Sequence, residues 1–174
     1  GKHVFVEKPI TLTRAHAEEA VAVCRAAGVT LGIGFNRRFS PAFTEVVRRV
    51  RAGDIGEVLH IEAHQSMPAG FGLPPGAWRT DRSEAPAGAL TQLGIHLLDG
   101  MIHLAGPVRS VFAMSDRRAM RADVDDFTVL LVRLGSGVTG YLGTSNVTGD
   151  LRRFHVSGTK GWVEMRGDTT VVSV

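Results

Sequence analysis

Short runs of strand-forming residues fill the second half of the sequence, and this pattern constrains the fold more than any other feature. Turns that contain glycine separate most of these runs. Consecutive strands joined by tight turns are typical of an antiparallel sheet, predicted here as a meander. The predicted strands cover residues 108–115, 127–134, 138–146, 151–158 and 162–166.

The first 35 residues follow a different pattern, in which a helix separates two strands. Residues 2–6 and 29–35 are predicted to be strands, the first of them buried. Thr13 can cap the helix between them, and Gly28 can end it. This region therefore predicts a β-α-β unit.

A second helix and a long strand precede an irregular segment. Ser40 can cap the helix and Gly53 can end it, and residues 57–66 are predicted to be a strand. Residues 65–88 are rich in glycine and proline and show no periodicity, which is typical of a functional loop. The fold class predicted for the whole chain is α+β: a βαβ segment followed by a mostly antiparallel sheet packed on helices.

The helix predicted over residues 89–105 is mostly apolar but carries one narrow polar stripe. Gln92, His96, Asp99 and His103 share this stripe at helical spacing. Such groups need partners, because an unsatisfied buried polar group costs about 1–3 kcal/mol.

Two interpretations of the stripe stay open. It can hydrogen-bond a neighbouring strand or loop, or His96 can face a pocket as an acid–base group whose ring Asp99 orients. Metal binding by His96, Asp99 and His103 would need a further ligand that the pattern lacks, so no metal is predicted.

Glu7, Lys8 and Pro9 follow the first predicted strand. Strand ends are where open α/β sheets bind ligands. Pro9 keeps Lys8 out of the helical backbone region and permits a cis bond. Lys8 can therefore present its ammonium group to a reacting oxygen, although an exposed lysine before a turn is the commoner case.

Composition excludes several classes of partner. Lys and Arg number 20 against 17 Asp and Glu, a net charge of +3, and the arginines are scattered rather than gathered in a stripe. The sequence has neither an apolar run of about 18 residues nor a signal peptide. A single cysteine suits a reducing cytoplasm. We therefore predict a cytoplasmic protein with no nucleic-acid or membrane partner; its abrupt apolar ends indicate a piece of a longer protein.

The spacing G-x-G-x-x-G at residues 135–140 matches a dinucleotide-binding fingerprint, but its context does not. That fingerprint works where a strand turns into a helix whose N-terminus meets a pyrophosphate. Strand-like residues flank it here on both sides, so we predict a hairpin turn.

Four motifs in order along the chain together resemble the Gfo/Idh/MocA family, that of glucose–fructose oxidoreductase and inositol dehydrogenase. They are GKHVFVEKP at residues 1–9, GFNRRF at 34–39, GALTQLGIHLLD at 88–99 and LRRFHVSGTKG at 151–161.

The resemblance implies an NAD(P)-dependent oxidoreductase that transfers hydride between nicotinamide and a hydroxyl of a sugar, cyclitol or related polyol. Residues 1–35 would be the end of a Rossmann domain, and residues 36–174 a substrate and dimerisation domain whose antiparallel sheet forms a homo-oligomer. NAD or NADP would be bound mainly by a preceding part. This chain alone is therefore expected to be inactive and to bind no cofactor tightly.

The resemblance also implies roles for single residues. Lys8 and His96 would be catalytic and would converge on one cavity, with Glu7, Lys8 and Pro9 beside the cofactor. The residues expected to contact the substrate are Asn36, Arg37, His64, Gln92 and Asp99.

Gln92 departs from the family pattern, which usually has Asp at this position. An amide cannot accept a proton, and losing a general base typically costs about 10²–10⁴-fold in rate. Either His96 and Lys8 carry the proton transfer unaided, or the chain belongs to a non-catalytic regulatory protein that binds sugar or nucleotide. A structural or assembly domain is the third alternative.

Overall fold

The computed structural model describes the chain from Gly1 to Val174, which divides into two compact units, Gly1–Asn36 and Arg37–Val174. In the first unit, strands β1 (Val4–Val6) and β2 (Leu31–Ile33) pair in parallel, and helix α1 (Arg14–Ala26) connects them. The predicted β-α-β unit is confirmed.

Helix α1 begins and ends where its sequence predicts. The side chain of Thr13 accepts a hydrogen bond from the backbone N–H of His16 at 3.3 Å. Gly28 follows the helix with a φ of +64°, a left-handed conformation that glycine adopts without a steric penalty. The predicted burial of the first strand is wrong within this unit, where Val4 and Phe5 are exposed. A two-stranded sheet with one helix leaves a face uncovered.

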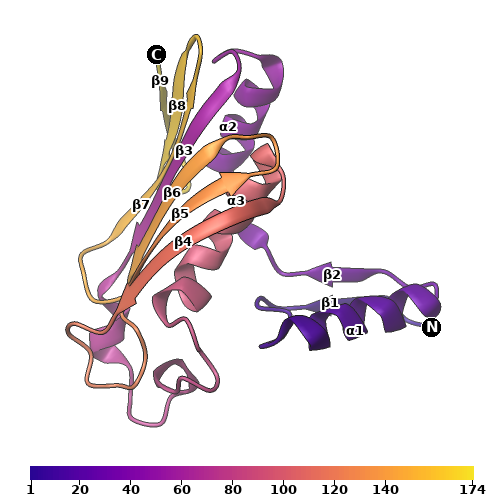
Figure 1. Cartoon of the computed structure of the whole chain (residues 1–174), viewed down its shortest axis with the longest axis vertical. Coiled ribbons are helices and arrows are strands. Elements are labelled where there is room, and N and C mark those ends of the chain that lie inside the picture. Colours follow the sequence, from indigo (N-terminus) through magenta and orange to yellow (C-terminus); the bar gives the residue numbers. More distant parts are fainter. The chain divides into compact units, whose positions relative to one another are not determined.

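The second unit is built on one seven-stranded sheet in the order β4-β5-β6-β3-β7-β8-β9 (Figure 1). Its strands are β3 (Val58–Ser66), β4 (Val108–Asp116), β5 (Phe127–Leu134), β6 (Thr139–Ser145), β7 (Leu151–Gly158), β8 (Gly161–Arg166) and β9 (Thr170–Ser173). The prediction of a mostly antiparallel sheet is confirmed.

The prediction of a simple meander is wrong at one place. Strand β3 lies between β6 and β7, parallel to β6 and antiparallel to β7. Each edge of a buried strand carries backbone N–H and C=O groups that must be paired. The long strand β3 meets this requirement at the centre of the sheet, where it is paired on both edges. The short segment between β6 and β7 therefore crosses the end of β3.

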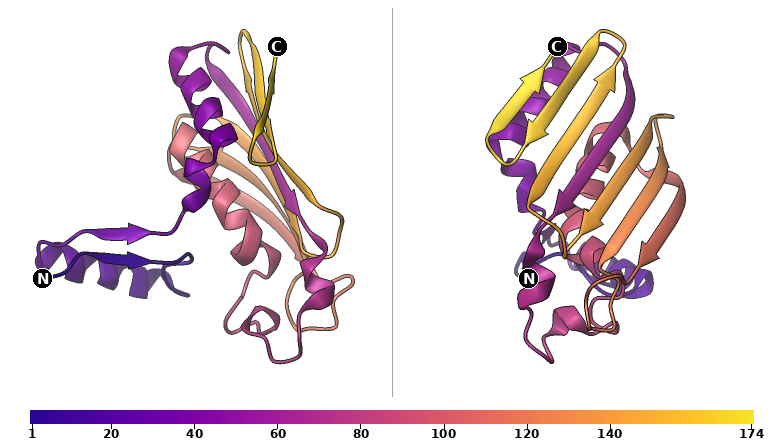
Figure 2. Two further views of the ribbon diagram at one scale, coloured as in Figure 1. Left: turned by 180° about the vertical axis from the view of Figure 1, so that it is seen from behind. Right: turned by 90° about the vertical axis from the view of Figure 1, so that its left-hand side faces the viewer.

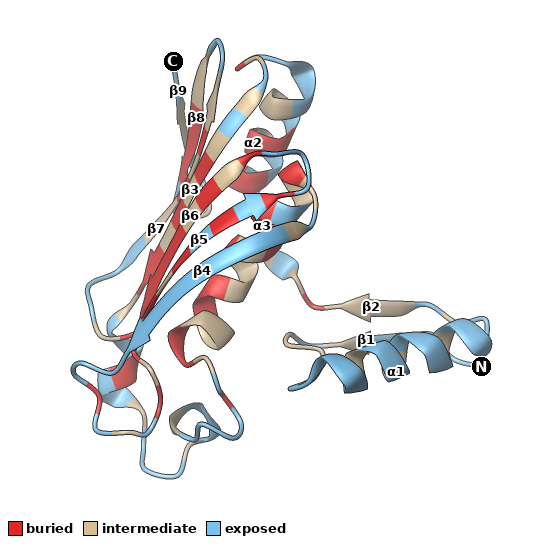
Figure 3. Cartoon of the chain, in the orientation of Figure 1, coloured by how far each residue is buried: buried red, intermediate tan, exposed pale blue.

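Helices cover one face of this sheet. Helix α2 (Pro41–Ala52) packs against β8 and β9, and helix α3 (Ile95–Ala105) packs against β3, β5 and β6. Buried side chains concentrate on the central strands and on the helix faces toward them, as Figure 3 shows in red. Members of this core include Phe43, Val46, Ile61, Leu97, Met101, Leu142 and Phe154.

The other face of the sheet has no helix on it, as the right-hand view of Figure 2 shows. We call it the open face. Its large exposed apolar side chains include Phe112, Met114 and Leu131, on β4 and β5. Polar and charged side chains occupy the part of this face formed by β3, β7 and β8.

The helix predicted over residues 89–105 starts differently from expectation. A π-helical turn, Leu90–Gly94, precedes α3. Gly94 lies close to β6, since a Cβ added there would come within 2.5 Å of Thr144 Cγ2. A π turn changes the angular phase of the residues within it. Gln92 lies within this π turn, before His96, Asp99 and His103 of α3.

The remaining connections are mostly short. The predicted loop after β3 contains two 3₁₀ turns, Pro68–Gly72 and Trp78–Thr80. A tight turn joins β5 to the antiparallel β6, so the G-x-G-x-x-G spacing is a hairpin as predicted. None of the helices combines the length and the apolar character needed to span a bilayer.

Candidate active site

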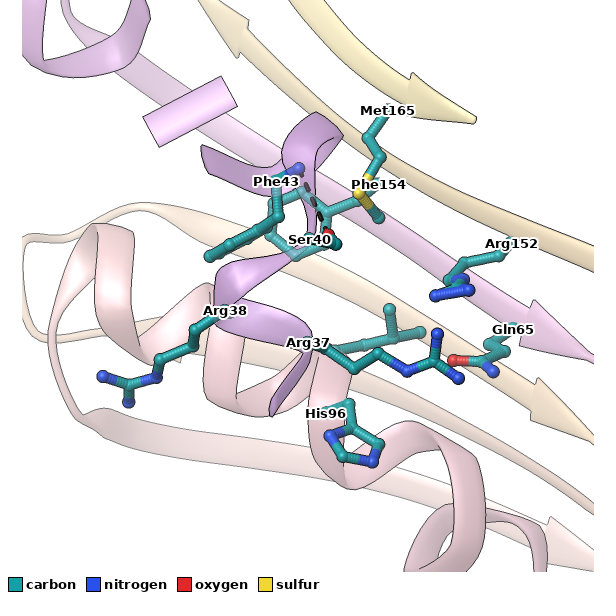
Figure 4. A pocket seen from close by; sticks show the side chains of 11 residues that line it. Arg37, Arg38, Ser40, Phe43, Gln65, His96, Arg152, Phe154 and Met165 are labelled. Carbon is teal, nitrogen blue, oxygen red and sulfur yellow. Dashed lines mark hydrogen bonds between the residues drawn. The ribbon is translucent and has the colours of Figure 1, made fainter. Parts of the chain in front are cut away.

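A small hollow, partly open to solvent, lies on the helix-covered side of the second unit. Side chains from the 3₁₀ turn η1 (Asn36–Phe39), from α2 and α3, and from strands β3, β7 and β8 surround it (Figure 4). They are Arg37, Arg38, Ser40, Phe43, Gln65, His96, Leu97, Gly100, Arg152, Phe154 and Met165.

His96 is the acid–base candidate in this hollow. It lies in the first turn of α3, next to the buried Leu97, and Figure 4 shows its ring at the rim formed by this helix. Helix α3 approaches α2 closely at Gly100, where an added Cβ would lie 3.0 Å from the Phe43 ring. An imidazole at this rim is suited to accept a proton from a bound hydroxyl.

Two arginines reach the same hollow and share one carboxylate. Arg152, on β7, forms two hydrogen bonds to Asp168, and Arg37 Nη1 donates to Asp168 Oδ2 at 3.1 Å. Burial lowers the pKa of Arg152, and the charge of Arg37 lowers it further. Two like charges thus lie near one another with one carboxylate between them.

Gln65 contributes a neutral polar group at the end of β3. Its side chain is 4% exposed, and its Oε1 atom has no hydrogen-bond partner in the structure. In Figure 4 its amide and the guanidinium groups of Arg37 and Arg152 point toward one another. The hollow therefore combines hydrogen-bond donors, one acceptor and an imidazole.

Arg38 contacts two residues of the polar stripe on α3, Asp99 and His103. Its guanidinium donates to both carboxylate oxygens of Asp99 at 2.6 Å, and it lies 3.3 Å from His103 Nδ1. The hydrogen bond to Asp99 raises the pKa of Arg38. Burial lowers the pKa of His103, with further contributions from Arg38 and Arg51. For Asp99 and His103, the interpretation that the stripe bonds a neighbouring segment is confirmed.

The structure brings together only part of the set expected to contact the substrate. Arg37 and His96 line the hollow, whereas Asp99 and Gln92 do not. The Gln92 amide donates to the carbonyl oxygen of Arg79 at 3.4 Å, in the loop after β3. Asn36 belongs to the first unit.

His64 requires a correction. Successive side chains of a strand point to opposite faces. Ile61, Ala63 and Gln65 are buried on the helix-covered side, so His64 lies on the open face. Burial lowers its pKa, as does the nearby charge of Arg153. Gln65, not His64, is the β3 residue that lines the hollow.

Sequence reasoning missed Gln65 and Arg152, although the sequence carries a signal for each. Gln65 is in phase with the apolar Ile61 and Ala63, and Arg152 is in phase with Phe154 and Val156. A polar residue in phase with buried apolar residues faces the covered side of its sheet. Alternation within each strand would therefore have found both.

The first unit holds the other predicted catalytic group. Glu7, Lys8 and Pro9 follow β1 at the carboxyl ends of the two parallel strands, and the Lys8–Pro9 bond is cis. The Glu7 carboxylate lies against Gly34, where an added Cβ would come within 2.9 Å of it. Open α/β sheets bind ligands such as NAD or NADP at the carboxyl ends of their strands, and Glu7 and Lys8 lie at this edge.

No group of three or more His, Cys, Asp or Glu side chains is arranged to hold a metal ion. The carboxylate of the candidate ligand Asp99 is instead bound by Arg38.

Comparison with known proteins defines the class to which this fold and this site belong. The model of the GFO/IDH/MocA C-terminal domain matches residues 43–164, and that of the oxidoreductase family with an NAD-binding Rossmann fold matches residues 1–35. The chain belongs to the Gfo/Idh/MocA family of oxidoreductases, as its motifs predicted.

Individual relatives agree with this assignment. The myo-inositol 2-dehydrogenase of Thermotoga maritima is 32% identical over 98% of this chain and 52% of its own length. The aldose-aldose oxidoreductase of Caulobacter crescentus, solved with glycerol, has a TM-score of 0.87 at 30% identity over 99% of this chain and 53% of its own. An NAD-binding oxidoreductase from Klebsiella pneumoniae has a TM-score of 0.88 at 27% identity; the match covers 98% of this chain and 50% of that protein. This chain spans about half the length of the curated relatives it matches.

Proposed function

We propose that the protein carrying this chain is a dehydrogenase that uses NAD or NADP and acts on a hydroxyl of a sugar, cyclitol or related polyol. The observation that carries the proposal is the position of His96 at the rim of a polar hollow in the domain that the family model matches. The dehydrogenase and oxidoreductase names of the relatives support it. They give no support to the non-catalytic alternative.

The chemistry needs a proton acceptor and a group that stabilises negative charge. In this proposal His96 takes the proton of the substrate hydroxyl, and the Lys8 ammonium stabilises the alkoxide as it forms. A bound nicotinamide would accept the hydride that leaves the carbinol carbon, so that the products are a carbonyl compound and the reduced cofactor. Pro9 restricts the backbone of Lys8, to which it is joined by a cis bond.

Two substitutions and their combination test this mechanism. We expect Lys8→Met and His96→Ala each to lower kcat by about 10²–10⁴-fold in the protein that carries this chain. If both groups act on one hydroxyl, the double variant will lose much less than the product of the single losses. Normal turnover of either variant with NAD or NADP would contradict the mechanism.

We also propose that two copies associate through the open face in the cytoplasm. The exposed Phe112, Met114 and Leu131 support this proposal, because contiguous apolar side chains on a surface often mark an interface. Leu131→Glu should shift the protein toward monomer in sedimentation velocity, and Arg48→Gln on α2, on the helix-covered side, is the control. An unchanged oligomeric state in the Leu131 variant would contradict the interface.

A further inference from the structure

The hollow that contains His96 has an excess of positive charge. A neutral polyol has no negative charge to pair with it. Three arginines line it, and no carboxylate does. Arg38 is neutralised by Asp99, and it points away from the other two in Figure 4. Arg37 and Arg152 share the single carboxylate of Asp168. Two positive charges against one negative charge leave an excess of one positive charge.

The arginines keep hydrogen-bonding capacity beyond their pairing with Asp168. A guanidinium has five N–H donors, and Arg37 uses only those of Nη1 toward Asp168. Its Nε and Nη2 groups therefore remain able to donate. The fork of a guanidinium matches the two oxygens of a carboxylate, and charge-assisted hydrogen bonds of this kind are about twice as strong as neutral ones.

Whereas the arginines offer hydrogen-bond donors, Gln65 offers an acceptor. Its buried Oε1 atom accepts no hydrogen bond, and leaving such a group unpaired costs about 1–3 kcal/mol. A ligand hydroxyl that donates to this atom would remove the cost. The hollow thus suits a molecule that carries an acidic group and a hydroxyl close together.

We propose that this hollow binds the carboxylate of a hydroxylated acid, so that the substrate is a sugar acid or another polyol carboxylate. The carboxylate accepts hydrogen bonds from Arg37 and Arg152, and a neighbouring hydroxyl donates to Gln65. The claim that the bound acid is the substrate rests on the function proposed above. Binding of the acid itself does not depend on turnover.

Calorimetry on the protein with matched pairs of probes tests the proposal. Gluconate is compared with glucitol, and glucuronate with glucose, so that each pair differs chiefly in the carboxylate. We expect at least one acid to bind about tenfold more tightly than its neutral partner. This preference should fall as salt is added, because part of the site is open to solvent.

Variants assign the preference to the hollow. Gln65→Glu keeps the shape of the side chain and adds a negative charge, and Arg37→Gln removes a positive one from a half-exposed position. Each should abolish the preference for the acid. Arg153→Gln is the matched control: Arg153 follows Arg152 on β7 but bonds Glu164 and Glu62, so the preference should persist. Thermal unfolding checks that each variant folds.

Several outcomes would overturn the proposal. They are equal or weaker binding of both acids, no binding of either acid at millimolar concentration, and a preference that survives both hollow variants. Tight binding of glucose 6-phosphate without binding of either carboxylate would assign the hollow to phosphate instead. Acid binding without oxidation by NAD or NADP would contradict only the dehydrogenase function, whereas oxidation of neutral polyols without acid binding would contradict only this inference.

Discussion

Arg152 and Arg153 are neighbours in β7, yet they belong to different chemical environments. Arg152 lies on the covered side of the sheet, bonds Asp168 and lines the hollow. Arg153 lies on the open face and bonds Glu62 at 3.0 Å and Glu164 at 2.5 Å. Strand alternation alone separates the two. Residue type therefore says less about function here than phase within the strand does.

The two faces also differ in how their charges are balanced. On the open face Glu62 and Glu164 face Arg153 and Arg166, so opposite charges are matched. On the covered side the arginines outnumber the carboxylates around the hollow. A balanced network is typical of a stabilised surface, and an unbalanced one in a hollow is typical of a binding site.

The largest expected change in the free energy of unfolding comes from the difference in packing between the two faces. Phe154 is 1% exposed on the covered side, and its ring meets that of Phe43 edge-on with 5.5 Å between centroids. We expect Phe154→Ala to lower the free energy of unfolding by about 3–5 kcal/mol, because it leaves a cavity in the core. Urea denaturation measures this loss.

Phe112→Ala on the open face is the matched control. Phe112 is 60% exposed, so we expect a change within about 0.5 kcal/mol. The measurement is made at low protein concentration, because self-association would add a term that depends on concentration. Similar losses in the two variants would show that the open face is covered in the folded protein.

The charge network of the open face should lose its contribution to stability at acid pH. The carboxyl of Glu164, 4% exposed on the open face, bonds Arg153, Arg166 and His155. Burial opposes its ionisation, but the hydrogen bonds from Arg153 and Arg166 outweigh this effect and lower its pKa from 4.5 to about 2. We expect Glu164→Gln to cost on the order of 2 kcal/mol of stability at neutral pH.

The sign of the pH dependence follows from the lowered pKa. The unfolded protein binds a proton at this carboxyl near its ordinary pKa of 4.5, whereas the folded protein does so only near 2. The stabilisation of the folded protein by Glu164 is therefore complete above the unfolded pKa of 4.5, and it disappears as the pH falls toward about 2. Urea denaturation across this range should show wild type and Glu164→Gln converging. A constant gap, or the same convergence with the exposed Glu57→Gln, would contradict the assignment.

Much of the fold and part of the site could be predicted from the sequence, and the misses have physical causes. Local signals located the helices, since Ser40 caps α2 and Gly53 follows it in a left-handed conformation. The placement of β3 between β6 and β7 depends on pairing between distant segments, which no local pattern specifies. The π turn before α3 depends on how closely Gly94 packs on β6, which the spacing of residues in the sequence does not specify.

His64 and Gln65 allow the sharpest test, because they are adjacent in β3 and lie on opposite faces. We expect Gln65→Leu to lower kcat/KM by about tenfold, since the substrate loses one hydrogen bond worth about 1.4 kcal/mol. His64→Leu should change kcat/KM less than about twofold, because its ring faces away from the hollow. Initial rates with NAD or NADP and a sugar acid measure both values. The reverse order would mean that the substrate binds on the open face, and the site would then have to be rebuilt around Glu62, His64 and Arg153.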